Sequence, residues 1–570
     1  MAGIVFGVVF LQLAVSVFFM SYEKKDYYAD DIYSYGSANS NAVLSPLSDD
    51  NDIITKIYTW QDSVTVRNYL TVSREEAFNF DYIKKIMCKE AHPPLYFYLL
   101  HFICSFVPYT FSKWSGFLIN IIGFVCMQIY LYRFVVLISL SREKALAVMS
   151  FFGFTSATIN MMCFLRMYML SVGIGMIYIF YLVKYIYNCL YDNKKTEKGL
   201  IMVFFALIAG ALTDYLFIIF AFIMSLCMCA VLFLKRKYGK MMCLIATGMF
   251  AVILAALCFP QVIDQIKKPQ QAVAGATMYP FKLQLRMAVH VISNGLFGIN
   301  TPILPTMFPY YLLWTVSGVT ILYLLAMFIF RHDEWFYYIR VFLRERLKRI
   351  PLIIKKNYYT TIPLSITIVT LLFIFSRRFL IFYYDYWSIR YLYIMAPIIT
   401  VICLLLIFFV LRNRWIIYGT IFFLLCMSLA RGSRCFLMNE DVRGGSVFEA
   451  VENADVILVE AVPEMFFYHT ADLLESRSFL YTTPAKLEDP EQIREILKKN
   501  GTGDKLVLIA DKNIISDSME KKEIRLFSHN AAKEVGPENN NIINLFRENE
   551  EFKNSEFCCE TQTAYVYRLK

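Results

Sequence analysis

The sequence predicts an all-α polytopic membrane protein with about 11 transmembrane helices and a small α/β domain at its C-terminal end. Of the 570 residues, 58% are hydrophobic and only 18% are charged, and the mean hydropathy is +0.49. A soluble chain of this length would need a more polar surface. The net charge is +10, and the basic residues lie mostly in short loops between apolar runs. This distribution is a topology signal, and the sequence has no nucleic-acid-binding motif.

A series of apolar runs accounts for the predicted spans, since a spanning helix needs about 20 apolar residues. Residues 2–20 form the first run, and no small-residue cleavage site is followed by a clear soluble start, so we interpret it as a helix rather than a signal peptide. The other candidates are 93–108, 114–138, 145–162, 167–187, 199–213, 215–234, 241–260, 286–300, 308–330, 359–380, 391–411 and 415–430.

Basic clusters indicate which loops are cytoplasmic. They lie at Arg142/Lys144, Lys194/Lys195/Lys198, Lys235–Lys240, 331–357 and Arg412/Arg414. If all five are cytoplasmic, the number of crossings between any two must be even. This parity assigns the short run 286–300 to the membrane interface. If the N-terminus is inside, the loop 21–92 is outside, and Arg142 is inside only if one of the runs 93–108 and 114–138 crosses. We assign the shorter run, 93–108, to the interface, and the tail then lies outside the cell.

The chain divides into a membrane module, residues 1–430, and a soluble extracytoplasmic tail, residues 431–570. In the tail, 455–461 and 505–511 have the pattern of buried strands, 491–499 that of an amphipathic helix, and 563–569 that of a last, edge strand. Strands alternating with helices predict a small α/β domain. No Gly-rich phosphate loop follows either buried strand, so we expect a docking or acceptor-positioning domain without chemistry.

Two polar stretches interrupt the apolar pattern on the predicted outer side. Asp30 and Asp31 follow the first helix, where a carboxylate could be a general base or only a solvated loop acid. Glu90 and His92 flank the His-Pro-Pro break of "KEAHPPLYFYLLH". The two prolines cannot donate backbone hydrogen bonds and fix an extended lead into the aromatic segment that follows.

Arginines beside tyrosines form a second polar group on the same side. Arg166 and Tyr168 lie in "FLRMYML", between two apolar runs. Arg390 and Tyr391 lie in "YYDYWSIRYLYIMAP", after Arg377 and Arg378. A cation at such a place is costly unless it snorkels or pairs with an anion. Each alone could be an interfacial anchor, but several on one side predict an anion site, with a lipid phosphate as a natural partner.

These stretches together resemble the GT-C superfamily of polytopic glycosyltransferases, in particular its bacterial protein mannosyltransferase (family 39) and aminoarabinose transferase branch. The resemblance covers residues 1–430 and rests on "ADDIYSYG", "HPPLYFYLLH" preceded by Glu90, the Arg-x-Tyr of "LRMYML", the "LTDYLF" turn and "IRYLYIMAP". The family commonly has Asp-Glu in place of Asp30-Asp31, often Asp in place of Glu90, and often His in place of Asp214.

The resemblance implies transfer of a sugar from a polyprenyl phosphate to an envelope glycan, lipid or protein at the plasma membrane, with inversion of the anomeric carbon. Asp30 would be the general base. Arg166, Arg390 and Arg377 would stabilise the leaving phosphate, with Tyr168 and Tyr391 beside them. Asp31, Glu90 and His92 would orient the acceptor or hold a divalent metal ion, whose use differs among family members.

Other functions remain open at this point. A transporter or flippase of lipid-linked substrates would place ionisable groups in the middle of spans and often has inverted repeats, and neither feature is present in this sequence. A structural scaffold with a sensing tail would leave the acid pair and the His-Pro-Pro break without a role. A polymerase or ligase of surface glycans would use similar lipid-linked substrates.

Overall fold

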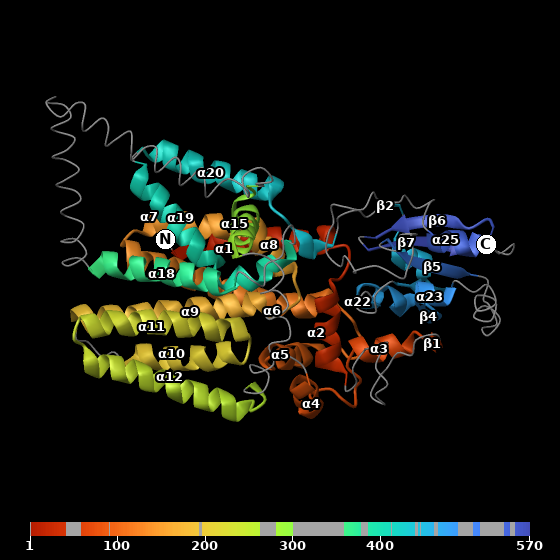
Figure 1. Cartoon of the computed structure of the whole chain (residues 1–570), viewed down its shortest axis with the longest axis horizontal. Helices are drawn as coiled ribbons and strands as arrows, with labels where there is room; N and C mark the ends of the chain where they lie inside the picture. The colour runs from red at the N-terminus through yellow and green to blue at the C-terminus, as the bar shows by residue number, and fades with distance from the viewer. Residues whose placement is uncertain are drawn as a thin grey trace.

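A computed structural model describes the chain over most of its membrane module and the sheet of its tail. The described residues are 2–40, 59–89, 92–192, 197–262, 281–299, 358–377, 386–411, 413–438, 443–444, 446–460, 466–487, 505–512, 541–547, 553–561 and 563–569. Long helices form a bundle, and a β-sheet lies beyond one end of it (Figure 1). The predicted class, an all-α membrane module with a small α/β domain, is confirmed.

Seven helices of the described residues are long and apolar enough to cross a membrane, so the chain is a multi-pass membrane protein. An eighth span is possible where α7 (Arg142–Gly153) and α8 (Ser156–Cys163) meet at an angle of 56°. The predicted run 308–330 and the basic cluster at 331–357 lie outside the described residues. The seven helices are α1 (Ala2–Phe18, extended by a π-helical turn Phe19–Glu23), α6 (Lys113–Ser139), α9 (Tyr168–Tyr187), α11 (Tyr215–Leu234), α12 (Tyr238–Cys258), α19 (Ala396–Val410) and α20 (Arg414–Arg431).

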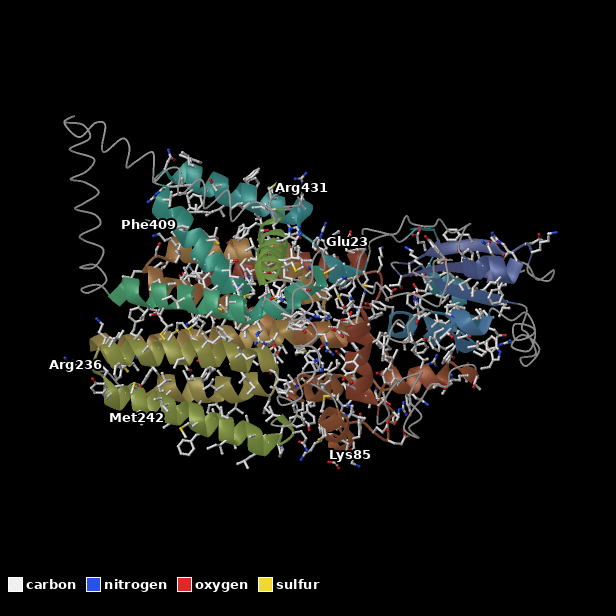
Figure 2. All side chains as sticks on the ribbon, in the orientation of Figure 1. Glu23, Lys85, Arg236, Met242, Phe409 and Arg431 are labelled. Carbon is white, nitrogen blue, oxygen red and sulfur yellow. The ribbon has the colours of Figure 1, made fainter. Side chains whose placement is uncertain are left out.

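Four further helices have apolar parts of only 10–17 residues, shorter than the other candidate spans. Two of them, α5 (Leu95–Cys104) and α15 (Phe281–Phe297), fall on the runs that we assigned to the interface. The other two are α10 (Glu197–Ala211) and α18 (Tyr358–Arg377). Large apolar side chains on the outer faces of the bundle, such as Met242 and Phe409, are 57% and 84% exposed and project outward (Figure 2). Such faces suit contact with lipid.

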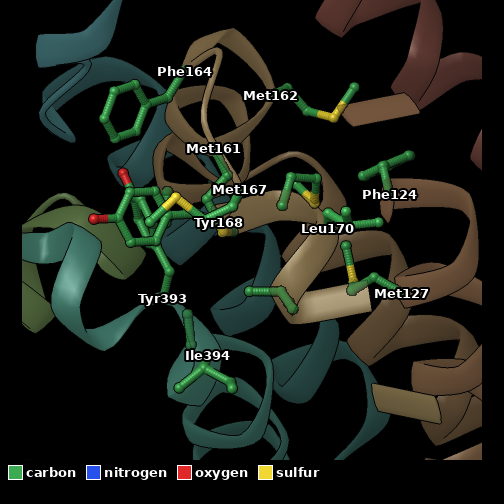
Figure 3. Close-up of a cluster of buried hydrophobic side chains, with 14 of the residues drawn as sticks. Phe124, Met127, Met161, Met162, Phe164, Met167, Tyr168, Leu170, Tyr393 and Ile394 are labelled. Carbon is green, nitrogen blue, oxygen red and sulfur yellow. The ribbon is translucent and has the colours of Figure 1, made fainter. Parts of the chain in front are cut away.

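Helices α6 and α9 pack closely because glycines face each other. A Cβ added at Gly173 would lie 2.5 Å from the Gly123 carbonyl oxygen, and one at Gly123 would lie 2.7 Å from that of Met169. Small residues that let backbones approach are the usual means of helix association in membranes. Beside this contact lies an apolar cluster that joins four elements (Figure 3). Its members include Phe124, Met127, Met161, Met162, Leu170, Tyr393 and Ile394.

The sheet of the tail has seven strands in the order β1-β4-β3-β5-β7-β6-β2. Its centre is parallel: β3 (Asp455–Val459) lies between β4 (Ser478–Thr482) and β5 (Leu506–Asp511). These strands and β7 (Ala564–Leu569) are almost wholly buried, and the apolar patterns of β3 and β5 predicted this for those two strands. The expectation that 563–569 is an edge strand is wrong, because β7 pairs antiparallel with both β5 and β6 (Glu556–Glu560). The predicted helix 491–499 lies outside the described residues.

One edge of this sheet comes from the first extramembrane loop. Strand β1 (Trp60–Asp62) pairs antiparallel with β4, whereas β2 (Arg443–Gly444) forms the other edge beside β6. The loop 21–92 and the tail therefore lie on the same side of the membrane, and the chain crosses an even number of times between them. The loop also forms α2 (Ala29–Asn39), α3 (Val64–Leu70) and α4 (Asp81–Lys89). Helix α2 lies at the end of the bundle nearest the sheet (Figure 1).

Candidate active site

The site begins at the first turn of α2. Asp30 and Asp31 lie there, where negative charge is favourable because the helix dipole is positive at its N-terminus. Asp30, Tyr33 and Ser34 share one face of the helix, since residues three and four apart are neighbours. The Asp30 side chain is 29% exposed, whereas that of Asp31 is fully buried. Asp30 is thus the carboxylate of the pair that a substrate can reach.

Arg390 forms the first cationic contact of Asp30. Its Nη1 donates to Asp30 Oδ2 at 3.0 Å and to the Tyr28 hydroxyl at 3.1 Å, while Nη2 donates to the Tyr391 hydroxyl at 3.2 Å. The residue belongs to a 3-10 helix, η4 (Tyr386–Met395), which leads into α19. Sequence analysis paired Arg390 with Tyr391, and the structure adds Asp30 and Tyr28.

Arg166 forms the second cationic contact and is almost inaccessible, with a side chain 2% exposed. Its Nε lies 4.0 Å from Asp30 Oδ2, and its Nη1 donates to Ser34 Oγ at 3.2 Å. Its Nη2 lies 3.0 Å from Nε2 of His92, and its guanidinium carbon lies 5.2 Å from the centre of the Tyr33 ring. The α2 face therefore presents one carboxylate, one hydroxyl and one aromatic ring to a single guanidinium.

His92 is a neutral base within this cluster. Burial and the neighbouring Arg166 lower its pKa to about 3. Because Arg166 can only donate, His92 Nε2 accepts and the proton is on Nδ1. That Nδ1 has no hydrogen-bond partner among the described residues. A buried donor of this kind is costly unless a further group, such as a substrate oxygen, accepts from it.

Asp30 is ionised at neutral pH in this arrangement. Burial raises its pKa, but the guanidinium groups of Arg166 and Arg390 outweigh burial and hold the pKa below its ordinary value of 3.8. Two guanidinium groups face one carboxylate, and His92 is neutral. Among the described residues, the cluster therefore has an excess positive charge that an anion such as phosphate could neutralise.

Asp31 is occupied by other partners. Its Oδ2 accepts from Lys24 Nζ at 2.9 Å and from the Tyr28 backbone N–H at 3.0 Å, and its Oδ1 accepts from the Leu165 backbone N–H at 2.7 Å. Lys24 also donates to the Phe436 carbonyl at 2.9 Å. Burial raises the pKa of Asp31, while Lys24 and the two backbone donors oppose this shift. Through these hydrogen bonds Asp31 holds the first turn of α2 against Leu165, the residue before Arg166.

Aromatic rings form a wall around the Arg390 side of the cluster. Tyr28 stacks on Trp387 at 4.3 Å between ring centres and meets the edges of Phe164, Phe436 and Tyr468. Phe164 in turn stacks on Phe436 at 3.8 Å. Tyr468 comes from α22 (Phe466–His469) of the tail, so the soluble domain contributes to the wall. Sequence analysis named none of these five residues.

The other residues named from the sequence lie in different places. Tyr168 stacks on Phe164 and meets the edge of Tyr393, so it belongs to the buried wall. Arg377 ends α18, where its Nε donates to Ser376, and it is not among the charges that act on Asp30. Asp214 caps α11 through the Leu216 N–H and accepts from Ser171. Glu90 and Arg378 lie outside the described residues.

The described residues do not fit a metal ion. No group of three His, Cys, Asp or Glu side chains within them is arranged to hold one. Of the residues named as ligands from the sequence, Asp31 is neutralised by Lys24, and His92 Nε2 faces Arg166. Glu90 lies outside the described part. We therefore derive no step that involves a metal.

The fold and site define a multi-pass membrane protein with an Asp-Arg-Arg cluster at one end of its helix bundle. No family model matches the chain, and no curated protein matches it. Two solved structures of ArnT from Cupriavidus metallidurans, one bound to undecaprenyl phosphate and one in the apo state, share 8% identity with it. They cover 99% of this chain and 98% of their own, with TM-scores of 0.44 and 0.42.

Proposed function

We propose that the protein is a membrane glycosyltransferase that moves a sugar from a polyprenyl-phosphate donor to an acceptor in the cell envelope. The observation that carries this proposal is the positive Asp30-Arg166-Arg390 cluster, placed where the membrane helices meet the soluble sheet. A lipid phosphate at the membrane surface supplies the anion that the cluster lacks. The motif resemblance to GT-C glycosyltransferases supports the same class of reaction.

The two arginines would bind the donor phosphate. The described contacts of Arg390 use three of its five N–H groups, and Arg166 Nε has no hydrogen-bond partner among the described residues. As the glycosidic bond breaks, negative charge grows on the phosphate. Fixed guanidinium groups in a site of low accessibility stabilise that charge without reorganisation.

Asp30 would be the general base toward the acceptor hydroxyl. Paired with two arginines, it is a weak base because its pKa is low. A phosphate that takes up guanidinium N–H groups would weaken this pairing and raise the pKa of Asp30. The donor would thereby activate the base, and attack from the acceptor side would invert the anomeric carbon. His92 would donate from Nδ1 to a substrate oxygen.

The site would face the extracytoplasmic side. The five basic clusters of the sequence support this orientation through the positive-inside rule. The sheet domain, joined to the first loop by β1, would then lie outside the membrane and close one wall of the site with Tyr468. From this place it would position the acceptor and carry out no chemistry of its own.

The test follows transfer of labelled sugar from the lipid-phosphate pool of membranes into envelope polymers. Asp30→Asn keeps a hydrogen-bonding side chain beside Arg390 but removes the base, and we expect a loss of at least about 100-fold in transfer, within the range that proton transfer contributes. Glu75→Gln, at an exposed acid of the same loop, is the matched control. Undiminished transfer by Asp30→Asn would exclude Asp30 as the base. Movement of the lipid-linked sugar across vesicles without any transfer would favour the transporter instead.

A further inference from the structure

A groove lies at the end of the bundle remote from Asp30. It has a volume of about 870 Å³ and is lined by side chains of α1, α6 and α9 and by the first residue of α7. Its walls are apolar, with Val9, Phe10 and Ile129 among them, and three cations border it: Arg133, Arg142 and Lys184. Phe10 is 65% exposed and Ile129 40% exposed, so the groove opens toward the lipid.

The position of the groove along α6 places it at the opposite membrane face. Lys113, at the start of α6, donates to the Lys24 carbonyl oxygen beside the candidate active site. Arg133 lies 20 residues further along the same helix, which corresponds to about 30 Å at about 1.5 Å per residue. That distance matches the hydrocarbon thickness of a bilayer. The cations therefore lie at the level of the other leaflet's headgroups.

Two of the three cations, Arg133 and Lys184, lie over aromatic rings at the rim of the groove. The Arg133 guanidinium lies 4.9 Å from the Phe180 ring centre and 5.4 Å from that of Tyr130, and Lys184 Nζ lies 5.8 Å from Phe180. Within the described part of the chain, none of Arg133, Arg142 and Lys184 forms an ion pair. Stacking positions a guanidinium while leaving its N–H groups to an anion.

We propose that this groove binds an anionic glycerophospholipid of the leaflet opposite the Asp30 site. The acyl chains would lie along the apolar wall of α1 and α6, and the headgroup phosphate would contact Arg133, Arg142 and Lys184. Charge complementarity selects this occupant: a neutral lipid would satisfy the walls but leave three cations without a counter-ion. Basic pockets between membrane helices at the cytoplasmic side are a recognised form of lipid site. The proposal is independent of the proposed transferase activity.

Fluorescence quenching by brominated lipids tests it on the full chain reconstituted in phosphatidylcholine vesicles. Phe10→Trp places a reporter in the groove, with Phe6→Trp as a second reporter should the first fail to fold. Because the chain has six tryptophans of its own, the reporter signal is the difference between the variant and the unsubstituted protein. Brominated phosphatidylglycerol should quench the reporter at lower mole fractions than brominated phosphatidylcholine. The ratio of the two apparent affinities measures headgroup selectivity and needs no enzymatic activity.

Removing the cations should remove the selectivity. Each of Arg133→Gln, Arg142→Gln and Lys184→Gln should lower it about fivefold, which corresponds to about 1 kcal/mol per cation near the surface. Arg236→Gln, at an exposed cation of the same end of the bundle but outside the groove, should leave it unchanged (Figure 2). Equal quenching by both lipids would overturn the proposal. So would displacement of the quenching lipid by a polyprenyl phosphate but not by phosphatidylglycerol.

Discussion

Replacing Arg390 tests the phosphate site most directly. Its guanidinium makes a 3.0 Å ion pair with Asp30 and two hydrogen bonds to tyrosine hydroxyls at 3.1 and 3.2 Å, so its position is fixed before a donor binds. One hydrogen bond to a charged group contributes about 1.5–3 kcal/mol. Arg390→Gln should therefore weaken binding of a polyprenyl phosphate by about 10- to 150-fold. Arg390→Lys keeps the charge but loses the planar guanidinium, so its affinity for the polyprenyl phosphate should lie between those of the wild type and Arg390→Gln.

The measurement compares a polyprenyl phosphate with the uncharged polyprenol of the same length, both added to the purified protein in nanodiscs. The ratio of their affinities isolates the phosphate contribution from that of the hydrocarbon tail. Arg390→Gln should lower this ratio, and Arg74→Gln, an exposed arginine of the first loop, should not. If the Arg390→Gln protein folds and keeps the wild-type ratio within twofold, Arg390 does not bind the phosphate and the reasoning fails.

Three further predictions concern stability of the purified full chain, measured by thermal unfolding. Burial raises the pKa of Asp26 and of Asp472 to about 8. The stability that these protonated groups contribute is therefore full below about pH 4 and is lost as the pH rises through about 8. Asp26→Asn should make the melting temperature fall less between pH 6 and pH 9 than it does in the wild type. Gly173→Leu should cost about 1–3 kcal/mol by overpacking the α6–α9 contact, whereas Gly248→Leu, at a position with open space, should cost little. Lys24→Met should lower the free energy of unfolding by about 3–5 kcal/mol, because it leaves the Asp31 charge buried without its partner. Adding Asp31→Asn should recover part of this loss. If the losses of the two single variants simply add in the double variant, the two residues do not form a buried pair.

Much of the fold was predictable because membrane helices follow from local composition. Long apolar runs predicted the spans, and the Pro-Pro break predicted the short α5. The bend between α7 and α8 was not predicted, because the run 145–162 is long and apolar enough on average to be one span. Its break comes at Thr155, which caps α8 by accepting from the Thr158 N–H. Hydropathy does not record such a cap.

The candidate site was partly predictable for a similar reason. Asp30, Arg166 and Arg390 stand out because a charge beside an apolar run is costly unless it has a partner. The partners themselves were not predictable: Tyr28 and Arg390 are 362 residues apart in the sequence. Tyr468 lies in the tail and touches Tyr28 only because the sheet docks on α2. Similarly, the sequence did not indicate that Lys24 pairs with Asp31, which leaves Asp30 as the accessible acid.

Strand β1 has a consequence for how the chain is made. Trp60 pairs with Leu480, so β1 must wait until the 420 residues from 61 to 480 have been synthesised before it has a hydrogen-bonding neighbour. Until then β1 is a segment of the first loop without a strand to pair with, and the sheet beyond the end of the bundle is not assembled. Ribosomes that stop early would release chains whose membrane helices are inserted but whose sheet cannot close. Synthesis of β4 is therefore the step that gives β1 its hydrogen-bonding neighbour.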